Sequence, residues 1–269
     1  MLFRSRGGVI RRLVGRAVAA EFKDEIAAAL GDHQHGVAKD GAARLHRRVC
    51  AYVHGDAGRL IVAVDLADAF STASRAALVE ACRRLLPELA PLVETWYGEP
   101  TLHWAPPQDG ESEGPWLEQL LGVDQGCPLS PALWSLLPAL IREHVLEVMR
   151  AIDPTARLEA FLDDHYLAGS EAAVKAGVQE FEQMFRAVGI LLRHTKTKVW
   201  APGRADKLGG DLETYRVTSL TVVGTAVAYL RGGEEDTEET RVVAGRVGLN
   251  LELDRDQGGA CCAQTDPLP

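Results

Sequence analysis

The chain has 269 residues, of which 46% are hydrophobic and 25% charged, with five cysteines and a net charge of −9. This composition is ordinary for a globular protein, no run approaches the ~20 apolar residues of a membrane helix, and the first residues lack the apolar core of a secretion signal. The scattered cysteines show no zinc spacing, so we expect an intracellular protein with free thiols.

The charge is uneven along the chain. Residues 1–60 hold 11 Lys and Arg against 6 Asp and Glu, whereas the remainder holds 18 against 32. The overall acidity argues mildly against a general nucleic-acid binder, although the N-terminal part is basic.

Two basic helices are predicted near the N-terminus. Apolar residues at helical spacing predict one helix from Val9 to Leu30, ended by Gly31, and a second from Ala42 to Val53. Three arginines on the polar face of the first helix form either a solvated surface or contacts for phosphates: Arg11, Arg12 and Arg16. Four histidines are too loosely spaced for a metal site and are expected on the surface or in loops: His33, His35, His46 and His54.

A buried strand is predicted next. Leu60 to Leu66 is a run of β-branched and apolar residues with Asp65 at its C-terminal end. Ser74 is a candidate N-cap for the helix that follows, and Asp65 taken alone is more simply explained as a cap as well. Residues 100–116 are rich in loops, with a strand edge at Thr101 to Trp104.

A loop bearing glycines and prolines, Gly122 to Pro131, leads into another predicted helix. The helix has apolar residues on one face from Leu133 to Met149 and contains Pro138. Backbone N–H groups exposed by such a loop suit a phosphate or a base pair. The alternative is an ordinary helix entry with Pro131 in the first turn.

Two adjacent acids, Asp163 and Asp164, lie between two short apolar runs. The runs read as strands from Arg157 to Leu162 and from His165 to Gly169, so we predict a tight hairpin with both acids at its tip. Like charges in an apolar setting repel, and a divalent metal would offset them. A lone Asp-Asp pair is more often a surface turn, so other motifs must support the metal interpretation.

The C-terminal third contains further short elements. Helical spacing from Val174 to Val188 is followed by a predicted strand at Ile190 to Leu192 and by two lysines within Thr195 to Trp200. Leu220 to Gly224 reads as one more strand. Residues 231–269 are acidic, lack apolar periodicity, and are expected to form a weakly ordered tail.

This order of elements predicts an α+β fold with a sheet backed by helices. If the two acid-bearing strands are neighbours, Asp65, Asp163 and Asp164 meet at one end of the sheet. Three facing carboxylates are poorly explained by stability. They are well explained by two Mg²⁺ ions held by carboxylates and substrate phosphates, an arrangement that serves phosphoryl transfer.

In these motifs the chain resembles the reverse transcriptase domain of non-LTR retrotransposons and, more loosely, the group II intron enzymes. Asp65 to Phe70 is similar to the first catalytic motif. Gly122 to Pro131 is similar to the family's glutamine–glycine loop, and Phe161 to Asp164 matches its aromatic-x-Asp-Asp hairpin.

Other segments extend the resemblance to roughly residues 5–230. Gly189 to Trp200 is similar to the next motif of the family, and Leu220 to Thr225 resembles its primer grip. Val9 to Leu30 and Gln34-His35-Gly36 are similar to the finger region. The resemblance therefore implies a polymerase-type palm with an antiparallel sheet backed by helices at 59–230, partial helical fingers at 1–58, and no clear thumb.

The resemblance also implies an activity, RNA-directed DNA polymerisation by a retroelement enzyme that adds dNTPs to a DNA primer on an RNA template. Two Mg²⁺ ions, which Mn²⁺ can replace, would be held by Asp65, Asp163 and Asp164, while Lys196 would assist departure of pyrophosphate. Phe70 would exclude ribonucleotides. Substrate contacts would come from Gln125, Gly126 and Pro128. A nuclear location rests on the resemblance alone.

Some positions depart from the family pattern. Cys127 stands where the family usually has aspartate, Asp124 and His165 are atypical, and the chain starts late in the fingers. These departures motivate an alternative, a truncated and catalytically inactive palm relic that at most binds nucleic acid or a partner. A third reading is another two-metal nucleotidyl transferase on a similar palm.

Overall fold

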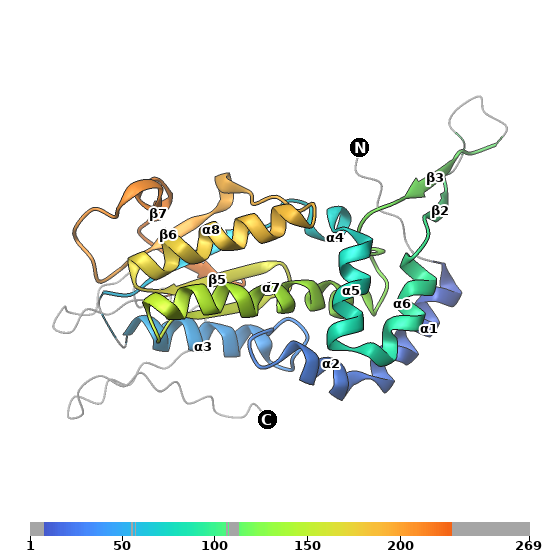
Figure 1. The fold of residues 1–269 in the computed structure, drawn as a ribbon, viewed down its shortest axis with the longest axis horizontal. Helices are drawn as coiled ribbons and strands as arrows, with labels where there is room; N and C mark the ends of the chain where they lie inside the picture. Colours follow the sequence, from blue (N-terminus) through green and yellow to red (C-terminus); the bar gives the residue numbers. More distant parts are fainter. Residues whose placement is uncertain (1–7, 55, 57, 106, 108–112, 228–269) are drawn as a thin grey trace.

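The computed structural model of the chain describes residues 8–54, 56, 58–105, 107 and 113–227 (Figure 1). The predicted tail at 231–269 lies outside the described residues. A five-stranded sheet with the order β4-β5-β1-β6-β7 forms the centre. Its strands are β1 (Leu60–Asp65), β4 (Arg157–Phe161), β5 (Asp164–Gly169), β6 (Lys198–Trp200) and β7 (Arg216–Val217).

The sheet is antiparallel except at one edge. β5 pairs with β4 and β1, and β1 pairs with β6, each time antiparallel, whereas β7 joins β6 in parallel. The predicted antiparallel, helix-backed palm is confirmed.

The central strand β1 is buried on both faces, which explains its unbroken apolar sequence. Leu60 and Val62 point into one hydrophobic core, and Ile61 points into the other. Because both faces are covered, polar residues do not alternate with apolar ones along the strand.

Helices cover one face of the sheet (Figure 1). The long helix α7 (Ser130–Ile152) packs beside α8 (Glu171–Ala187), and α5 (Arg75–Leu85) packs against α7 with α6 (Ala90–Tyr97) beyond it. The opposite face is covered by α3 (Gly41–His54) and a hairpin of β8 (Leu220–Val222) and β9 (Thr225–Val227). The short helices are α4 (Ala69–Thr72), η1 (Pro87–Leu89), η2 (His194–Lys196) and η3 (Gly210–Tyr215).

The predicted single helix from Val9 to Leu30 is wrong in one respect, because the chain bends at Phe22. Two helices result, α1 (Val9–Glu21) and α2 (Lys23–Leu30), with Phe22 at φ −93° and ψ 22° between them. Phe22 packs against the main core, and α2 contacts α7. Tertiary packing therefore redirects a segment whose local periodicity is continuous. The predicted stop at Gly31 is confirmed by its φ of 68°.

Two other expectations have different outcomes. The strand edge at Thr101 to Trp104 is confirmed as β2 (Thr101–Trp104), which pairs with β3 (Trp116–Gln119) in a hairpin that projects from the body (Figure 1). The predicted strand Ile190 to Leu192 is wrong, because Leu192 makes only an isolated bridge to Leu66.

Local capping was predicted correctly at α5. Ser74 Oγ accepts a hydrogen bond from Ala77 N at 3.3 Å at the start of the helix.

Among the described residues, no helix combines the length and apolar character that crossing a lipid bilayer requires.

Candidate active site

The acid hairpin turns one residue earlier than predicted. Phe161 pairs with Asp164, so the turn consists of Leu162 and Asp163, and Asp164 is the first residue of β5. Leu162 adopts a left-handed φ of 55°. The prediction that both acids form the connection is therefore wrong, because cross-strand pairing continues through Asp164.

The structure brings Asp65 to this hairpin. In the antiparallel register of β1 and β5, Asp65 lies opposite Asp164. The C-terminal end of β1 and the turn before β5 thus lie at the same end of the sheet. Three carboxylates separated by almost a hundred residues in sequence gather at that end.

A cleft of about 260 Å³ opens at this end of the sheet. Five of the predicted site residues line it: Asp65, Phe70, Gln125, Asp163 and Lys196. Asp164, Gly126 and Pro128 are not among its lining residues. Pro128 instead faces α1, where its Cδ lies 3.6 Å from the position of a Cβ built on Gly15. The roles assigned to all eight residues stay predictions.

Burial and mutual repulsion act on the hairpin acids. Burial, followed by repulsion from Asp65, raises the pKa of Asp163 above its usual value. Burial, followed by the charges of Asp163 and Asp65, likewise raises the pKa of Asp164. Lys196 opposes both shifts. The acid cluster therefore favours any additional positive charge.

Two cations already face Asp65. Its Oδ2 lies 3.4 Å from Nη1 of Arg193 and 3.5 Å from Nζ of Lys196. Arg193 also approaches Asp68 Oδ1 at 3.5 Å. Sequence analysis missed Arg193 and Asp68. The available signal was their spacing, because each lies three residues from a predicted site residue: Arg193 precedes η2, which contains Lys196, and Asp68 lies in the turn between β1 and α4.

The carboxylates of the cleft are candidate ligands for a divalent metal. Within the described ranges, no three His, Cys, Asp or Glu side chains are placed to enclose an ion by themselves. Magnesium, however, is usually held by one or two carboxylates together with waters and substrate phosphates. Asp65 Oδ2 is buried and accepts no hydrogen bond from Arg193 or Lys196 at 3.4 and 3.5 Å, so a cation at shorter range would satisfy it. The donor set of Asp65 and Asp163 thus fits a metal that binds together with a phosphate.

Phe70 and the glutamine–glycine loop form the wall of the cleft beside the acids. The Phe70 ring lies 5.4 Å from the Trp134 ring of α7, and Phe70 O accepts a hydrogen bond from Val123 N at 2.8 Å. Gln125 Nε2 donates to Ser71 Oγ at 3.3 Å. Gly126 has a φ of 85° with open space around it, a conformation that favours glycine. The loop is therefore docked on the segment that follows Asp65.

A buried ion pair joins this loop to α1. Asp124 is buried, and its Oδ2 lies 3.0 Å from Nη1 of Arg11. The Arg11 guanidinium lies 4.8 Å and 4.7 Å from the ring centroids of Trp96 and Tyr97. Both interpretations offered for Arg11, a solvated surface or a phosphate contact, are wrong, because it anchors α1 to the loop. Arg12 and Arg16 are exposed, so both interpretations remain for them.

The other atypical residues have packing roles. Cys127 is 3% exposed, and its Sγ lies 3.0 Å from the position of a Cβ on Gly15, so it packs on α1 rather than facing the cleft. His165 is buried between Phe181 and Phe185, and its Nδ1 donates to Asp163 O at 3.0 Å. Burial lowers the pKa of His165 to about 4, so it is neutral at pH 7.

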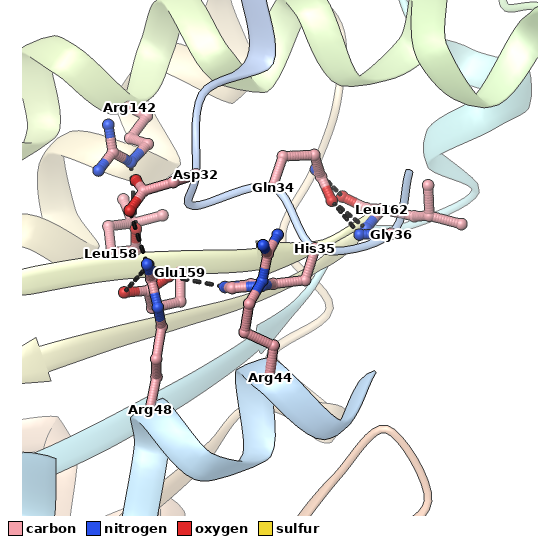
Figure 2. Close-up of polar contacts among 10 residues, drawn as sticks. All are labelled: Asp32, Gln34, His35, Gly36, Arg44, Arg48, Arg142, Leu158, Glu159 and Leu162. Atoms are coloured by element: carbon pink, nitrogen blue, oxygen red, sulfur yellow. Dashed lines mark hydrogen bonds and ion pairs between the residues drawn. The ribbon is translucent and has the colours of Figure 1, made fainter. Parts of the chain in front are cut away.

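Two of the four histidines expected on the surface or in loops, His33 and His35, do lie in a loop but are buried rather than exposed. His33 is 9% exposed and His35 is fully buried. His35 Nε2 donates to Glu159 Oε2 at 2.8 Å, and its Nδ1 accepts from Arg44 Nε at 3.3 Å (Figure 2). Loop composition predicts exposure. The edge of β4, which buries this loop, is far away in sequence.

The fold and the cleft together define a polymerase-type palm, with an acid-bearing antiparallel sheet, helices behind it and a cleft at the acidic end. The family model described as reverse transcriptase (RNA-dependent DNA polymerase) matches residues 8–227, and the chain belongs to this family.

Solved structures support the same fold. The apo telomerase from Candida tropicalis, truncated from its C-terminal domain, has a TM-score of 0.57 at 14% identity, covering 78% of this chain and 43% of that one. The Candida albicans telomerase in complex with a fragment of telomeric RNA has a TM-score of 0.52 at 13% identity, covering 82% and 36%. This chain thus spans less than half the length of either. A search of curated proteins found no match.

Proposed function

We propose that this chain catalyses RNA-directed DNA synthesis, in which a primer 3′-hydroxyl attacks the α-phosphate of a dNTP and pyrophosphate leaves. The observation that carries the proposal is the cleft where Asp65 and Asp163 meet beside Lys196, Phe70 and Gln125. A structural role does not explain why mutually repelling carboxylates gather around one opening together with two cations that face Asp65.

Each side chain has a role in this proposal. Asp65 and Asp163, supported by Asp164, would hold two Mg²⁺ ions, which Mn²⁺ could replace. Bound metal would supply positive charge for the attacking and leaving oxygens. Lys196 and Arg193 place further positive charge at the mouth of the cleft, where it would offset the charge of the triphosphate and of departing pyrophosphate.

Phe70 and the glutamine–glycine loop, which form the wall of the cleft beside the acids, would select the substrate. The Phe70 ring, supported by Trp134, would close the space needed by a ribonucleotide 2′-hydroxyl. Gln125 would contact the nascent base pair, with Gly126 allowing close approach of the backbone. Pro128 would act only through the position of this loop, since it packs toward α1.

The partners in this proposal are an RNA template, a DNA primer and dNTPs. A non-LTR retroelement origin, and the nuclear location that goes with it, are supported by the motif pattern of Asp65 to Phe70 and Phe161 to Asp164. We further propose that residues 1–58 act as fingers and 59–230 as the palm.

Primer extension tests the proposal. The chain is incubated with an RNA template, an annealed DNA primer, dNTPs and Mg²⁺, beside Asp163→Asn and the control Asp211→Asn, an exposed acid outside the cleft. The parent and the control should extend the primer, and Asp163→Asn should lose at least ~100-fold in rate, because removing a group aimed at transition-state charge costs that much. Equal extension by Asp163→Asn would contradict the assignment.

The second candidate is a catalytically inactive palm that at most binds nucleic acid or a partner. Cys127 in the glutamine–glycine loop favours a loss of catalysis, and the acidic net charge of −9 favours weak binding of nucleic acid. Titration of a labelled RNA–DNA hybrid at two salt concentrations separates the two, because binding without any extension by the parent supports the inactive palm. The salt slope would count the phosphate contacts.

A further inference from the structure

The segment from His33 to Gly36 extends the sheet beside the acid hairpin. His35 N donates to Ala160 O at 2.8 Å, and Ala160 N donates to His33 O at 2.9 Å, so the segment runs parallel to the outer edge of β4. β4 is the edge strand of the sheet. The segment therefore reaches the hairpin turn from the side opposite Asp65.

The Gln34 side chain is bound to the backbone of this turn. Its Oε1 accepts hydrogen bonds from Leu162 N at 2.8 Å and from Gly36 N at 3.0 Å. Its Nε2 donates to Leu162 O at 3.4 Å. Gln34 is 3% exposed, so water does not compete for these contacts. Figure 2 shows the amide directed at the Leu162 backbone.

Leu162 needs such support because its conformation is unfavourable. A φ of 55° is costly for a residue with a side chain, and surrounding contacts must maintain it. Asp163 is the next residue in the turn. Asp163 now points into the cleft. If Leu162 relaxed to another backbone conformation, the following peptide would rotate and turn the Asp163 side chain away from it.

Gly36 lets the segment approach this closely. A Cβ on Gly36 would lie 2.5 Å from Leu162 Cγ and 2.8 Å from Leu162 N. Both distances are below any real contact, and one of the atoms is backbone. A residue with a side chain at position 36 would therefore push directly on the turn.

Polar contacts tie the same segment to β4 and α3. The buried His35 donates to Glu159, and Arg48 of α3 lies 3.2 Å from Glu159 Oε2 and 2.6 Å from Asp32 Oδ2 (Figure 2). Because both flanks of Gln34 are tied to neighbouring elements, contacts other than those with the turn position its amide.

We propose that Gln34 is a positioning residue. Its amide holds Leu162 in the left-handed conformation that directs Asp163 into the cleft beside Asp65. The proposal rests on the proposed function of the cleft for its kinetic consequence, whereas its structural part stands without it.

The main test replaces Gln34 by methionine, which keeps the size of the side chain and removes all of its hydrogen bonds to Leu162 and Gly36. Exchange of the Leu162 amide proton, followed by NMR, should accelerate at least ~10-fold while the amides of β1 stay within ~3-fold of the parent. In primer extension, kcat should fall ~10- to 100-fold with KM for dNTP within ~3-fold, since a small misplacement at the reacting centre affects the chemical step. Gly36→Ala, which keeps the hydrogen bonds of Gln34 but crowds Leu162, should also lower kcat.

Asp153→Ala is the matched control. Asp153 accepts hydrogen bonds from Thr155 N at 2.9 Å, from Thr155 Oγ1 at 2.7 Å and from Ser170 N at 2.7 Å, at the opposite end of β4 and β5. It removes a comparable set of backbone contacts far from the cleft, so it should lower the unfolding midpoint but leave kcat within ~3-fold of the parent.

Three results would overturn the proposal. Unchanged exchange of Leu162 in Gln34→Met would show that the amide does not hold the turn. An equal loss of kcat in Asp153→Ala would show that general instability is responsible. Parent-like exchange and kcat in Gly36→Ala would show that the turn tolerates displacement, and this variant decides the case if Gln34→Met fails to fold. A parent without extension refutes the proposed function, and Leu162 exchange still decides the role of Gln34.

Discussion

The Arg11–Asp124 pair allows a quantitative prediction for Arg11→Met. The Asp124 side chain has no exposed surface, and its two oxygens accept no hydrogen bond, so Arg11 at 3.0 Å is its ion-pair partner, while the buried Arg75 guanidinium acts on it from farther away. Removing one partner of a buried ion pair costs about 3–5 kcal/mol, because the other charge stays buried and unpaired. Loss of the contacts with the Trp96 and Tyr97 rings adds about 1 kcal/mol, while methionine keeps the apolar packing.

The expected fall in the free energy of unfolding is therefore about 5 kcal/mol, which corresponds to about 15 °C in Tm for a chain of this size. Urea unfolding followed by circular dichroism measures it. Arg12→Met is the control, since Arg12 is an exposed neighbour on the same helix and should stay within about 0.5 kcal/mol of the parent.

A double-mutant cycle isolates the ionic part. Asp124→Asn combined with Arg11→Met removes both charges, so the double variant should be more stable than the sum of the single losses predicts, by about 2 kcal/mol. If Arg11→Met loses no more unfolding free energy than Arg12→Met, the ion pair does not stabilise the fold. If the losses of Arg11→Met and Asp124→Asn are simply additive, Asp124 is satisfied without Arg11.

Two further predictions concern His165 and Phe70. Because burial lowers the His165 pKa from 6.5 to about 4, the unfolded chain binds more protons between these values, and stability is lost as pH falls through this window, by on the order of 3 kcal/mol. The urea midpoint of His165→Gln should change less between pH 7 and pH 4.5 than that of the parent. An equal change of the midpoint in both proteins would contradict this. Phe70→Ala should raise the ratio of ribonucleotide to deoxyribonucleotide kcat/KM at least ~10-fold, since a contact that excludes one hydroxyl is worth at least that much. Trp116→Ala, an exposed aromatic on β3, should leave the ratio unchanged, and an unaltered ratio in Phe70→Ala would refute the steric role.

Features set by near neighbours in sequence were predictable. The cap at Ser74, the stop at Gly31 and the buried run of β1 follow from hydrogen bonds or apolar spacing within a few residues. The meeting of Asp65 with the acid hairpin was predicted only on the condition that their strands are neighbours. The register that places Asp65 opposite Asp164 supplies that condition.

Features set by distant contacts were not predictable. The bend at Phe22 interrupts a continuous apolar period because Phe22 packs against the main core and α2 packs against α7. The hairpin turns at Leu162 because pairing reaches Asp164 and because Gln34, more than a hundred residues earlier, binds the turn. Likewise, nothing near Arg11 in sequence indicates its buried partner Asp124.

By itself, the sequence determined most of the helices and strands and the carboxylates at their ends, since backbone preferences and apolar periodicity act over a few residues. Only the tertiary structure decided which side chains are buried together, as Arg11 with Asp124, His35 with Glu159, and Gln34 with Leu162. Such pairings depend on contacts between segments far apart in the chain. Local propensity carries no information about them.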